Sequence, residues 1–311
     1  MEERQKMTSE TFTPSLQDVK VTLAPKAPRN RIWEIDFLRG ACVVLMILDH
    51  LVMMIAQFFG PAWFGVDMAG DGGAAFCRWC AWFHESEVRT AVRTAVLFVF
   101  FSISGISCTF SRSNVKRGIV LAAVAMLYTG LSYGAENVLG ISGMHVNFGV
   151  LHFYAACILF YALIEIICRR FFRDGTLAKC IASVAVIVLV VCLYYLYTPP
   201  ADTPEWLAPL FPYEDAYGNP SLFYDRGEFS PGDICNLIPW SAFFFTGTAI
   251  APLLYPRRYS LLPFMDGKWN KPVNFIGKYA IFFYMLHVIV VAALLMLISY
   301  LFVTPGDWVL M

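Results

Sequence analysis

Charged side chains are scarce in this sequence. Only 15% of its 311 residues are Asp, Glu, Lys or Arg, whereas soluble domains carry about 25%. The deficit is concentrated in long uncharged stretches, and 58% of the chain is hydrophobic. A soluble protein of this length would still need a polar surface against water, so an ordinary soluble domain is excluded. Lipid must take the place of water around the uncharged stretches, and we expect an integral membrane protein.

The signatures of several soluble enzyme classes are also missing. The sequence has no glycine-rich phosphate loop of the Rossmann or Walker type, no H-E-x-x-H motif and no G-x-S-x-G elbow. Its net charge is zero, which gives no indication of a nucleic-acid partner. The nine cysteines lie mostly in apolar runs, and the single C-x-x-C at Cys77 and Cys80 is weak support for a metal or redox site. We predict neither a metal nor a nucleic acid as a partner.

Seven apolar segments are long enough, or nearly so, to cross a bilayer as helices. A spanning helix needs about 20 residues, because each residue adds 1.5 Å across about 30 Å of hydrocarbon. The segments are Ile35–Phe58, Arg93–Phe110, Gly118–Gly134, Phe148–Cys168, Cys180–Tyr197, Asn236–Leu254 and Phe275–Val303. We predict an all-α polytopic transmembrane helix bundle of about seven spanning helices over residues 32–311, preceded by a disordered cytoplasmic tail over residues 1–31.

The distribution of basic residues predicts the orientation of this bundle. Short cytoplasmic loops collect Lys and Arg, and a cytoplasmic N-terminus puts eighteen of the 23 Lys and Arg residues on the inner side. The first apolar segment begins too late for a conventional signal peptide, so we expect it to be retained. Two long segments, residues 59–92 and 198–235, then lie outside, where ordered loops of such length are commonly functional.

The first apolar segment carries ionisable residues at two depths. Asp36 and Arg39 are three residues apart, so they share a helical face at the cytoplasmic end and can offer a cation to an anionic ligand. A salt bridge at the interface is the alternative. Asp49 and His50 lie about 15 Å further along, inside the hydrocarbon, where ionisable groups usually face a cavity or a partner. A neutral imidazole there can act as a general base or be acylated, and a hydrogen bond between helices is the alternative.

Small residues gather on one face of the second segment. Ser102, Ser104, Gly105 and Ser107 would let the backbone of another helix approach closely. We predict that this face has a structural role.

Five stretches of the chain resemble a known family. The first runs from Arg31 to His50 and follows an R-x-x-x-I-D-x-x-R-G start with a histidine at the helix end. The others are Phe98–Arg117, Phe148–Phe153, Leu237–Trp240 and Phe275–His287. Together and in this order they resemble bacterial members of the family named for heparan-alpha-glucosaminide N-acetyltransferase.

This resemblance implies a membrane acyltransferase. It would use cytoplasmic acetyl-CoA, or another acyl-CoA, to modify an amine or hydroxyl of a sugar or envelope glycan on the far side. His50 falls near the position expected for the catalytic histidine, with Asp49 beside it. Lysosomal members place their histidine after a glycine-rich stretch, so His84, which follows Gly72 and Gly73, is a rival. The chain has no usable N-x-[ST] sequon, which favours a bacterial inner membrane over a lysosome.

Three further positions complete the predicted site. His152 lies at the outer end of the fourth segment, where it can line the same cavity as His50 or cap a helix. His287 lies in the inner half of the last segment, opposite Arg39 in depth, as a contact for a nucleotide phosphate or as a packing residue. Arg117 belongs to an inner basic loop that would bind coenzyme A phosphates if it lined a cleft, with positive-inside topology as the alternative.

Two other functions fit the same residues. A proton-coupled transporter or permease would use Asp49, His50 and His287 as a proton path, and a degenerate relative would serve as a scaffold subunit. No internal repeat of useful length is visible, which counts against repeat-built transporters. The expected partners are acyl-CoA, a glycan acceptor and the lipid bilayer, with a homodimer as a further option. Transfer through an acyl-histidine and transfer in a ternary complex both stay open.

Overall fold

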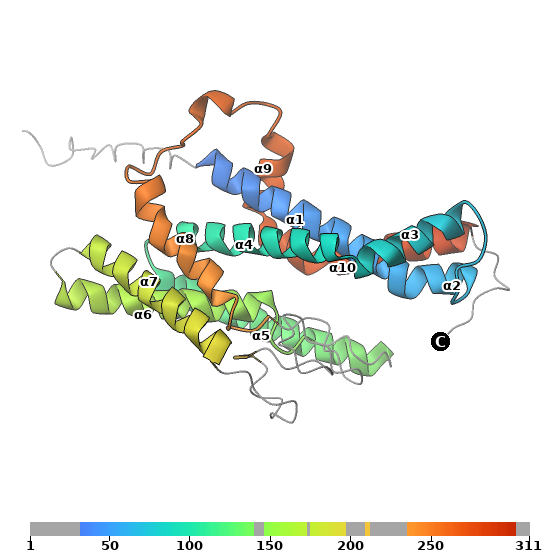
Figure 1. The fold of residues 1–311 in the computed structure, drawn as a ribbon, viewed down its shortest axis with the longest axis horizontal. Helices are drawn as coiled ribbons and strands as arrows, with labels where there is room; N and C mark the ends of the chain where they lie inside the picture. Colours follow the sequence, from blue (N-terminus) through green and yellow to red (C-terminus); the bar gives the residue numbers. More distant parts are fainter. Residues whose placement is uncertain (1–31, 140–145, 173–174, 197–208, 212–234, 303–311) are drawn as a thin grey trace, which may run out of the picture. The chain divides into compact units, whose positions relative to one another are not determined.

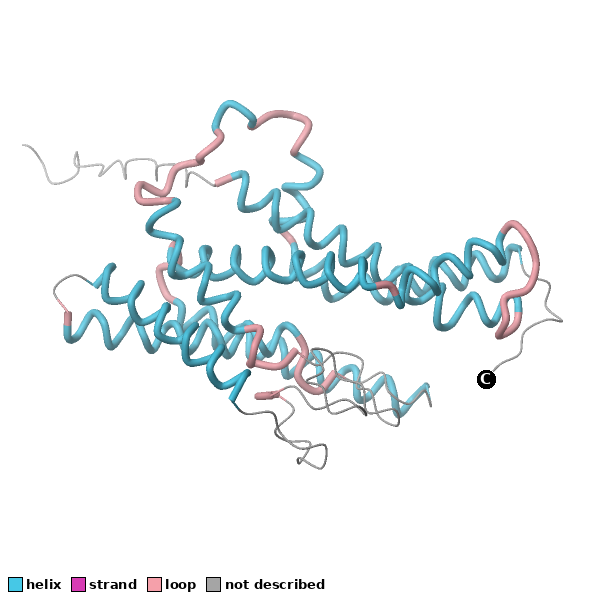
Figure 2. Tube along the Cα trace, in the orientation of Figure 1, coloured by secondary structure: helices cyan, strands magenta, loops and turns pink. Residues whose placement is uncertain are grey.

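The computed structural model of the chain describes residues 32–139, 146–172, 175–196, 209–211 and 235–302 (Figure 1). Within these residues the chain folds into helices joined by loops, with no strand among them (Figure 2). The predicted all-α membrane fold is therefore confirmed. The predicted tail over residues 1–31 and most of the long segment over residues 198–235 lie outside the described residues.

The helices follow one another along the chain with short connections in most places. They are α1 (Trp33–Met54), the π-helix η1 (Ile55–Phe59), α2 (Gly60–Phe64), α3 (Gly73–Glu85), α4 (Glu87–Thr109), α5 (Asn114–Leu139), α6 (Val150–Phe171), α7 (Gly175–Leu196), α8 (Ser241–Leu254), the 3-10 helix η3 (Pro263–Met265), α9 (Lys271–Lys278) and α10 (Ala280–Phe302).

Six helical stretches in the described part of the chain are long and apolar enough to span a bilayer. They are Trp33–Phe64, Glu87–Thr109, Asn114–Val138, Val150–Phe171, Gly175–Leu196 and Ala280–Leu301. The predicted segment Asn236–Leu254 contributes only the 14-residue apolar helix α8, which is about 21 Å long at 1.5 Å per residue. Pro239 disfavours a helical backbone at the preceding Ile238, and α8 begins at Ser241.

Two sequence-predicted boundaries need correction. The segment Phe275–Val303 is not one helix, because α9 ends at Lys278 and the backbone leaves helical geometry at Tyr279 before α10 begins at Ala280. Residues 59–92, predicted as an outer loop, are mostly helical and contain the end of η1, α2, α3 and the start of α4. The buried face of α3, with Cys77 and Cys80, packs in one apolar cluster with Leu295 of α10. This segment is therefore part of the packed bundle.

Helices α1 and α9 touch backbone to backbone. A Cβ atom added to Gly277 would lie 1.7 Å from the carbonyl oxygen of Asp36, and one added to Gly40 would lie 2.0 Å from that of Val273. Any side chain at either position would force the helices apart. The two glycines, which belong to the motifs quoted above, thus bring α9 against the Asp36–Arg39 turn of α1.

Helices α4 and α8 are joined in the same way. The Ser102 hydroxyl donates to the carbonyl oxygen of Phe243 at 3.0 Å. A Cβ atom on Gly105 would lie 2.1 Å from Phe244 O, and one on Gly247 would lie 1.9 Å from Ser102 O. The predicted packing role of this small-residue face is confirmed.

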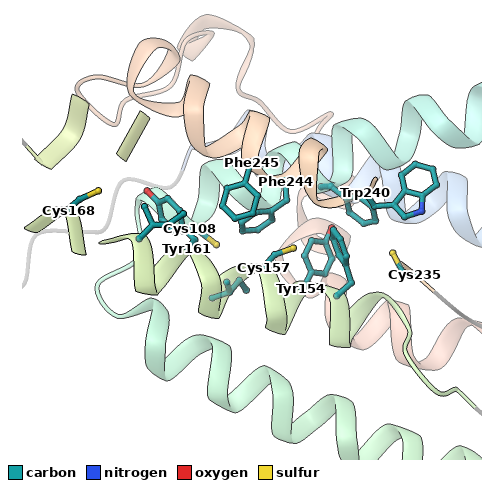
Figure 3. Close-up of a cluster of buried hydrophobic side chains, with 13 residues drawn as sticks. Cys108, Tyr154, Cys157, Tyr161, Cys168, Cys235, Trp240, Phe244 and Phe245 are labelled. Carbon is teal, nitrogen blue, oxygen red and sulfur yellow. The ribbon is translucent and has the colours of Figure 1, made fainter. Parts of the chain in front are cut away.

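Aromatic and cysteine side chains fill the core between α4, α6 and α8 (Figure 3). Phe101 and Phe153 are fully buried, with ring centroids 4.5 Å apart, and Trp240 packs against the same cluster. Polar contacts between helices lie beside this core. Asn114 Nδ2 donates to Glu165 Oε2 at 2.8 Å, and Lys179 Nζ is 3.9 Å from Glu165 Oε1. The buried carboxylate of α6 is thereby bound to both α5 and α7.

The α4–α8 contact can be tested with one methyl group. Gly247→Ala places a Cβ against the Ser102 carbonyl, and overpacking of this kind costs about 1–3 kcal/mol. Gly130→Ala in α5 is the matched control because nothing lies within 4 Å of its Cβ position. We expect a clear fall in the thermal unfolding temperature of the purified protein for Gly247→Ala and none for Gly130→Ala. Equal unfolding temperatures for the two variants would contradict the contact.

Candidate active site

Two histidines face each other across α1 and α10. The ring centroids of His50 and His287 are 4.6 Å apart and their planes are perpendicular. Nδ1 of His50 lies 2.9 Å from Met46 O, and Nδ1 of His287 lies 2.6 Å from Tyr284 O. Because a carbonyl oxygen can only accept, each neutral ring carries its proton on Nδ1 and a lone pair on Nε2. Nε2 of His50 is therefore the nitrogen that can take up a proton or an acyl group.

The structure places His287 with His50 and not with Arg39. His287 is only 6% exposed and lies seven residues, or about 10 Å, into α10. The sequence prediction put it opposite Arg39 because α9 and α10 were treated as one helix. In the structure α9 occupies that position, and its Gly277 carbonyl accepts a hydrogen bond from Arg39.

Asp49 is held by an arginine from another helix. Arg89, in the first turn of α4, donates from Nε to Asp49 Oδ1 at 2.6 Å and from Nη2 to Asp49 Oδ2 at 2.9 Å. It also donates from Nη1 to the carbonyl oxygen of His84, at the end of α3, at 3.0 Å. Arg89 is only 9% exposed. One buried guanidinium thus joins α1, α3 and α4 beside His50.

Arg89 is the functional residue that sequence reasoning missed, since it was counted only as an outer basic residue. A usable signal lay three residues before it. Ser86 caps the N-terminus of α4, with its Oγ accepting from the backbone N–H of Arg89 at 3.2 Å. A Ser followed by an acidic residue before an apolar run is typical of a helix start, which would have placed Arg89 on a helix that faces the bundle.

His84 contacts the Asp49–Arg89 pair through its backbone. Its carbonyl binds Arg89, while its ring is half-buried at the last turn of α3. Burial, and secondarily the Arg89 charge, lower the pKa of His84 from the ordinary value of 6.5. The two rival histidines of the sequence prediction are therefore linked through Asp49 and Arg89.

The contacts of His152 are on another part of the bundle. Its Nε2 lies 3.3 Å from Thr129 Oγ1 on α5, and its ring packs on Phe148 at 5.5 Å. The Thr129 hydroxyl donates its hydrogen to Val146 O at 2.7 Å, so it accepts from His152, which must carry its proton on Nε2. These contacts do not bring His152 to His50, and they fix the opposite tautomer.

A cationic cluster lies at the other end of α1. Arg39 donates to Asp36 Oδ1 at 3.0 Å, to Ser107 Oγ at 2.6 Å and to Gly277 O at 3.4 Å. The predicted Asp36–Arg39 pair is confirmed. Arg117 of α5 approaches the next residue of α4, with Nη1 3.7 Å from Cys108 Sγ. Arg39 and Arg117 thus meet at the carboxyl end of α4, and the bonds of Arg39 use three of its five N–H groups.

The cysteine pair of α3 lies in the apolar packing. Cys77 and Cys80 are buried, and burial raises the pKa of Cys80 to about 11. Such a thiol stays protonated at neutral pH, which disfavours thiolate redox chemistry at Cys80. Within the described residues, no group of three or more His, Cys, Asp or Glu side chains could hold a metal ion.

Comparison with known proteins identifies one family. Residues 31–289 match the family model described as heparan-alpha-glucosaminide N-acetyltransferase, catalytic. No curated protein and no solved structure matches. The matched range contains α1 through the His287 region of α10, and so both the imidazole pair and the Arg39 cluster.

The lowered pKa of His84 predicts a loss of stability in acid. The unfolded chain takes up the proton more readily, so the stability that His84 contributes is complete above about pH 6.5 and is lost as the pH falls through the lower pKa of the folded chain. We expect the wild-type unfolding temperature to fall more between about pH 7.5 and pH 5.5 than that of His84→Gln. Parallel falls in the two proteins would contradict the assignment.

Proposed function

The chain belongs to the heparan-alpha-glucosaminide N-acetyltransferase catalytic family, and from this membership we propose that it is a membrane-embedded acyltransferase. The donor is acetyl-CoA, or another acyl-CoA, on the cytoplasmic side. The acceptor is an amine or hydroxyl of a sugar or envelope glycan on the far side. A bacterial inner membrane and a homodimer stay predictions.

The imidazole pair is the observation that carries this proposal. His50 lies in a membrane-spanning helix with its Nδ1–H bound to Met46 O, which leaves the Nε2 lone pair as its reactive position. The perpendicular ring of His287, fixed in turn by Tyr284 O, packs against it. The imidazole is thus oriented by a backbone carbonyl and by a neighbouring ring, as a general base or nucleophile must be.

Two routes use the same nitrogen. In direct transfer, Nε2 of His50 accepts the proton of the acceptor amine or hydroxyl as that group attacks the thioester carbonyl, and the proton then passes to the departing CoA thiolate. In the two-step route, Nε2 attacks the thioester and releases CoA, and the acceptor then attacks the acyl-imidazole to restore the free ring. His50 carries the chemistry in both routes.

The Arg39 cluster supports a donor site at the cytoplasmic end. Arg39 and Arg117 converge on the end of α4, and guanidinium groups suit phosphate recognition. Arg39 and His50 are eleven residues apart on α1, or about 16 Å. In this proposal the CoA phosphates bind near Arg39 and Arg117, with Asp36 orienting Arg39, and the pantetheine arm crosses the interval to His50.

A proton-coupled transporter is the second candidate, because His50 and His287 are in ring contact within the membrane. Its proposed path also needs Asp49 to exchange protons. Both oxygens of that carboxylate are bound, by Nε and Nη2 of Arg89, and a carboxylate in such a two-point pair is poorly placed to exchange protons. The geometry therefore favours the acyltransferase.

Acyl transfer by membranes that contain the protein tests the proposal. With labelled acetyl-CoA and an amine-bearing sugar, the wild type should release free CoA and label the sugar. His50→Ala should lower this rate by at least about 100-fold, the usual contribution of a general base. His152→Ala should retain most of the activity because its contacts lie on α5 and at the start of α6.

Folding must be checked in the same preparations. Thermal unfolding of His50→Ala and His50→Gln shows whether the loss is chemical. Normal labelling of the sugar by a folded His50→Ala protein would remove His50 from the mechanism. Proton uptake coupled to solute movement, without consumption of acetyl-CoA, would favour the transporter.

A further inference from the structure

We propose that Arg89 is a positioning residue for acyl transfer: through Asp49 it fixes the α1 turn that carries His50. This inference rests on the proposed role of His50. Arg89 is not expected to touch the reacting atoms, since its three bonds go to Asp49 and to the His84 carbonyl.

The contact geometry is specific to arginine. Nε and Nη2 bind the two oxygens of one carboxylate, at 2.6 and 2.9 Å, while Nη1 binds a third oxygen on α3. A planar guanidinium can form this fork and a lysine ammonium cannot. Because Arg89 is 9% exposed, the pair is also little screened by solvent. Lysine at this position would keep the charge and lose the fork.

The fork acts on the turn of α1 that orients the catalytic ring. Asp49 directly precedes His50, and the carbonyl that binds His50 Nδ1 belongs to Met46, one turn earlier. Movement of Asp49 would therefore move the His50 ring relative to His287, its neighbour at 4.6 Å. Displacements of about 1 Å at a catalytic group can reduce rates about 100-fold.

Arg89 and Asp49 also neutralise each other. Their closest atoms, Arg89 Nε and Asp49 Oδ1, are 2.6 Å apart. Removal of one partner would leave the other charge unpaired among packed helices, which is strongly destabilising. A substitution that keeps the charge, Arg89→Lys, is therefore the informative one.

The same geometry changes the role of Asp49. Sequence analysis placed Asp49 among the catalytic residues, as a partner of His50. An ionised carboxylate with both oxygens bound to Arg89 can accept hydrogen bonds but is poorly placed to take the proton of a substrate. In this proposal Asp49 is the anchor for Arg89.

Chemical modification of His50 reports on the position of its ring without any enzymatic turnover. Diethyl pyrocarbonate acylates neutral imidazole nitrogens, and mass spectrometry of the full-length protein in detergent follows His50 alone. At one fixed pH we expect Arg89→Lys to raise the rate of His50 modification severalfold, because the ring is no longer held against His287. His152 in the same protein is the internal control, and its modification rate should not change.

Arg89→Lys tests positioning with the charge retained. We expect kcat for acyl transfer to fall about 100-fold. The KM for acyl-CoA should not change, because the proposed donor site lies at the Arg39 end of α1. A purely structural defect would lower the amount of folded protein. It would not lower kcat of the folded protein while leaving KM unchanged.

The outcomes separate the two proposals. A wild-type kcat in Arg89→Lys, or a wild-type rate of His50 modification in that variant, would overturn the positioning role. If the wild type transfers no acyl group but His50 modification is faster in Arg89→Lys, the proposed function fails and the Arg89–Asp49–His50 linkage stands.

Discussion

A charge inside a bilayer is tolerated only with a partner, and for Asp49 and Glu165 that partner comes from another helix. Asp49 of α1 binds Arg89 of α4, and Glu165 of α6 binds Asn114 of α5 and faces Lys179 of α7. Each of these carboxylates therefore makes its helix dependent on a neighbour. Apolar side chains alone would not select these pairings, since lipid tails are as apolar as the helix surfaces. The Asp49–Arg89 pair thus helps to determine which helices meet beside His50.

Close backbone contact is the second factor that determines which helices pack together. Gly40 and Gly277 let α1 and α9 touch, while Gly105 and Gly247 do the same for α4 and α8. The first contact brings the Gly277 carbonyl to Arg39. In this way the glycines of the family motifs act on the cationic cluster through helix packing, without any contact of their own with a ligand.

Local features of the sequence predicted their parts of the structure well. The Asp36–Arg39 pair depends on a three-residue spacing, and the small-residue face of α4 depends on composition, so both could be seen in the sequence. The His50–His287 and Asp49–Arg89 contacts join residues far apart in the chain, which no periodicity reveals. The break at Tyr279 was missed because apolar residues lie on both sides of Lys278 and Tyr279, and hydropathy registers composition but not the end of a helix.

Backbone carbonyls distinguish the histidines more sharply than burial does. The neutral ring of His50 keeps its lone pair on Nε2 because its Nδ1–H donates a hydrogen bond to Met46 O. His152 keeps its proton on Nε2, since the Thr129 hydroxyl that it faces already donates to Val146 O. His50 and His152 both have apolar neighbours in the sequence. Nε2 is nevertheless a lone-pair acceptor in His50 and an N–H donor in His152. In the proposed mechanism, the helical turn before His50, held by Asp49 and Arg89, orients that ring so that Nε2 is the reacting nitrogen, and this requirement accounts for the presence beside it of an ion pair that touches no substrate.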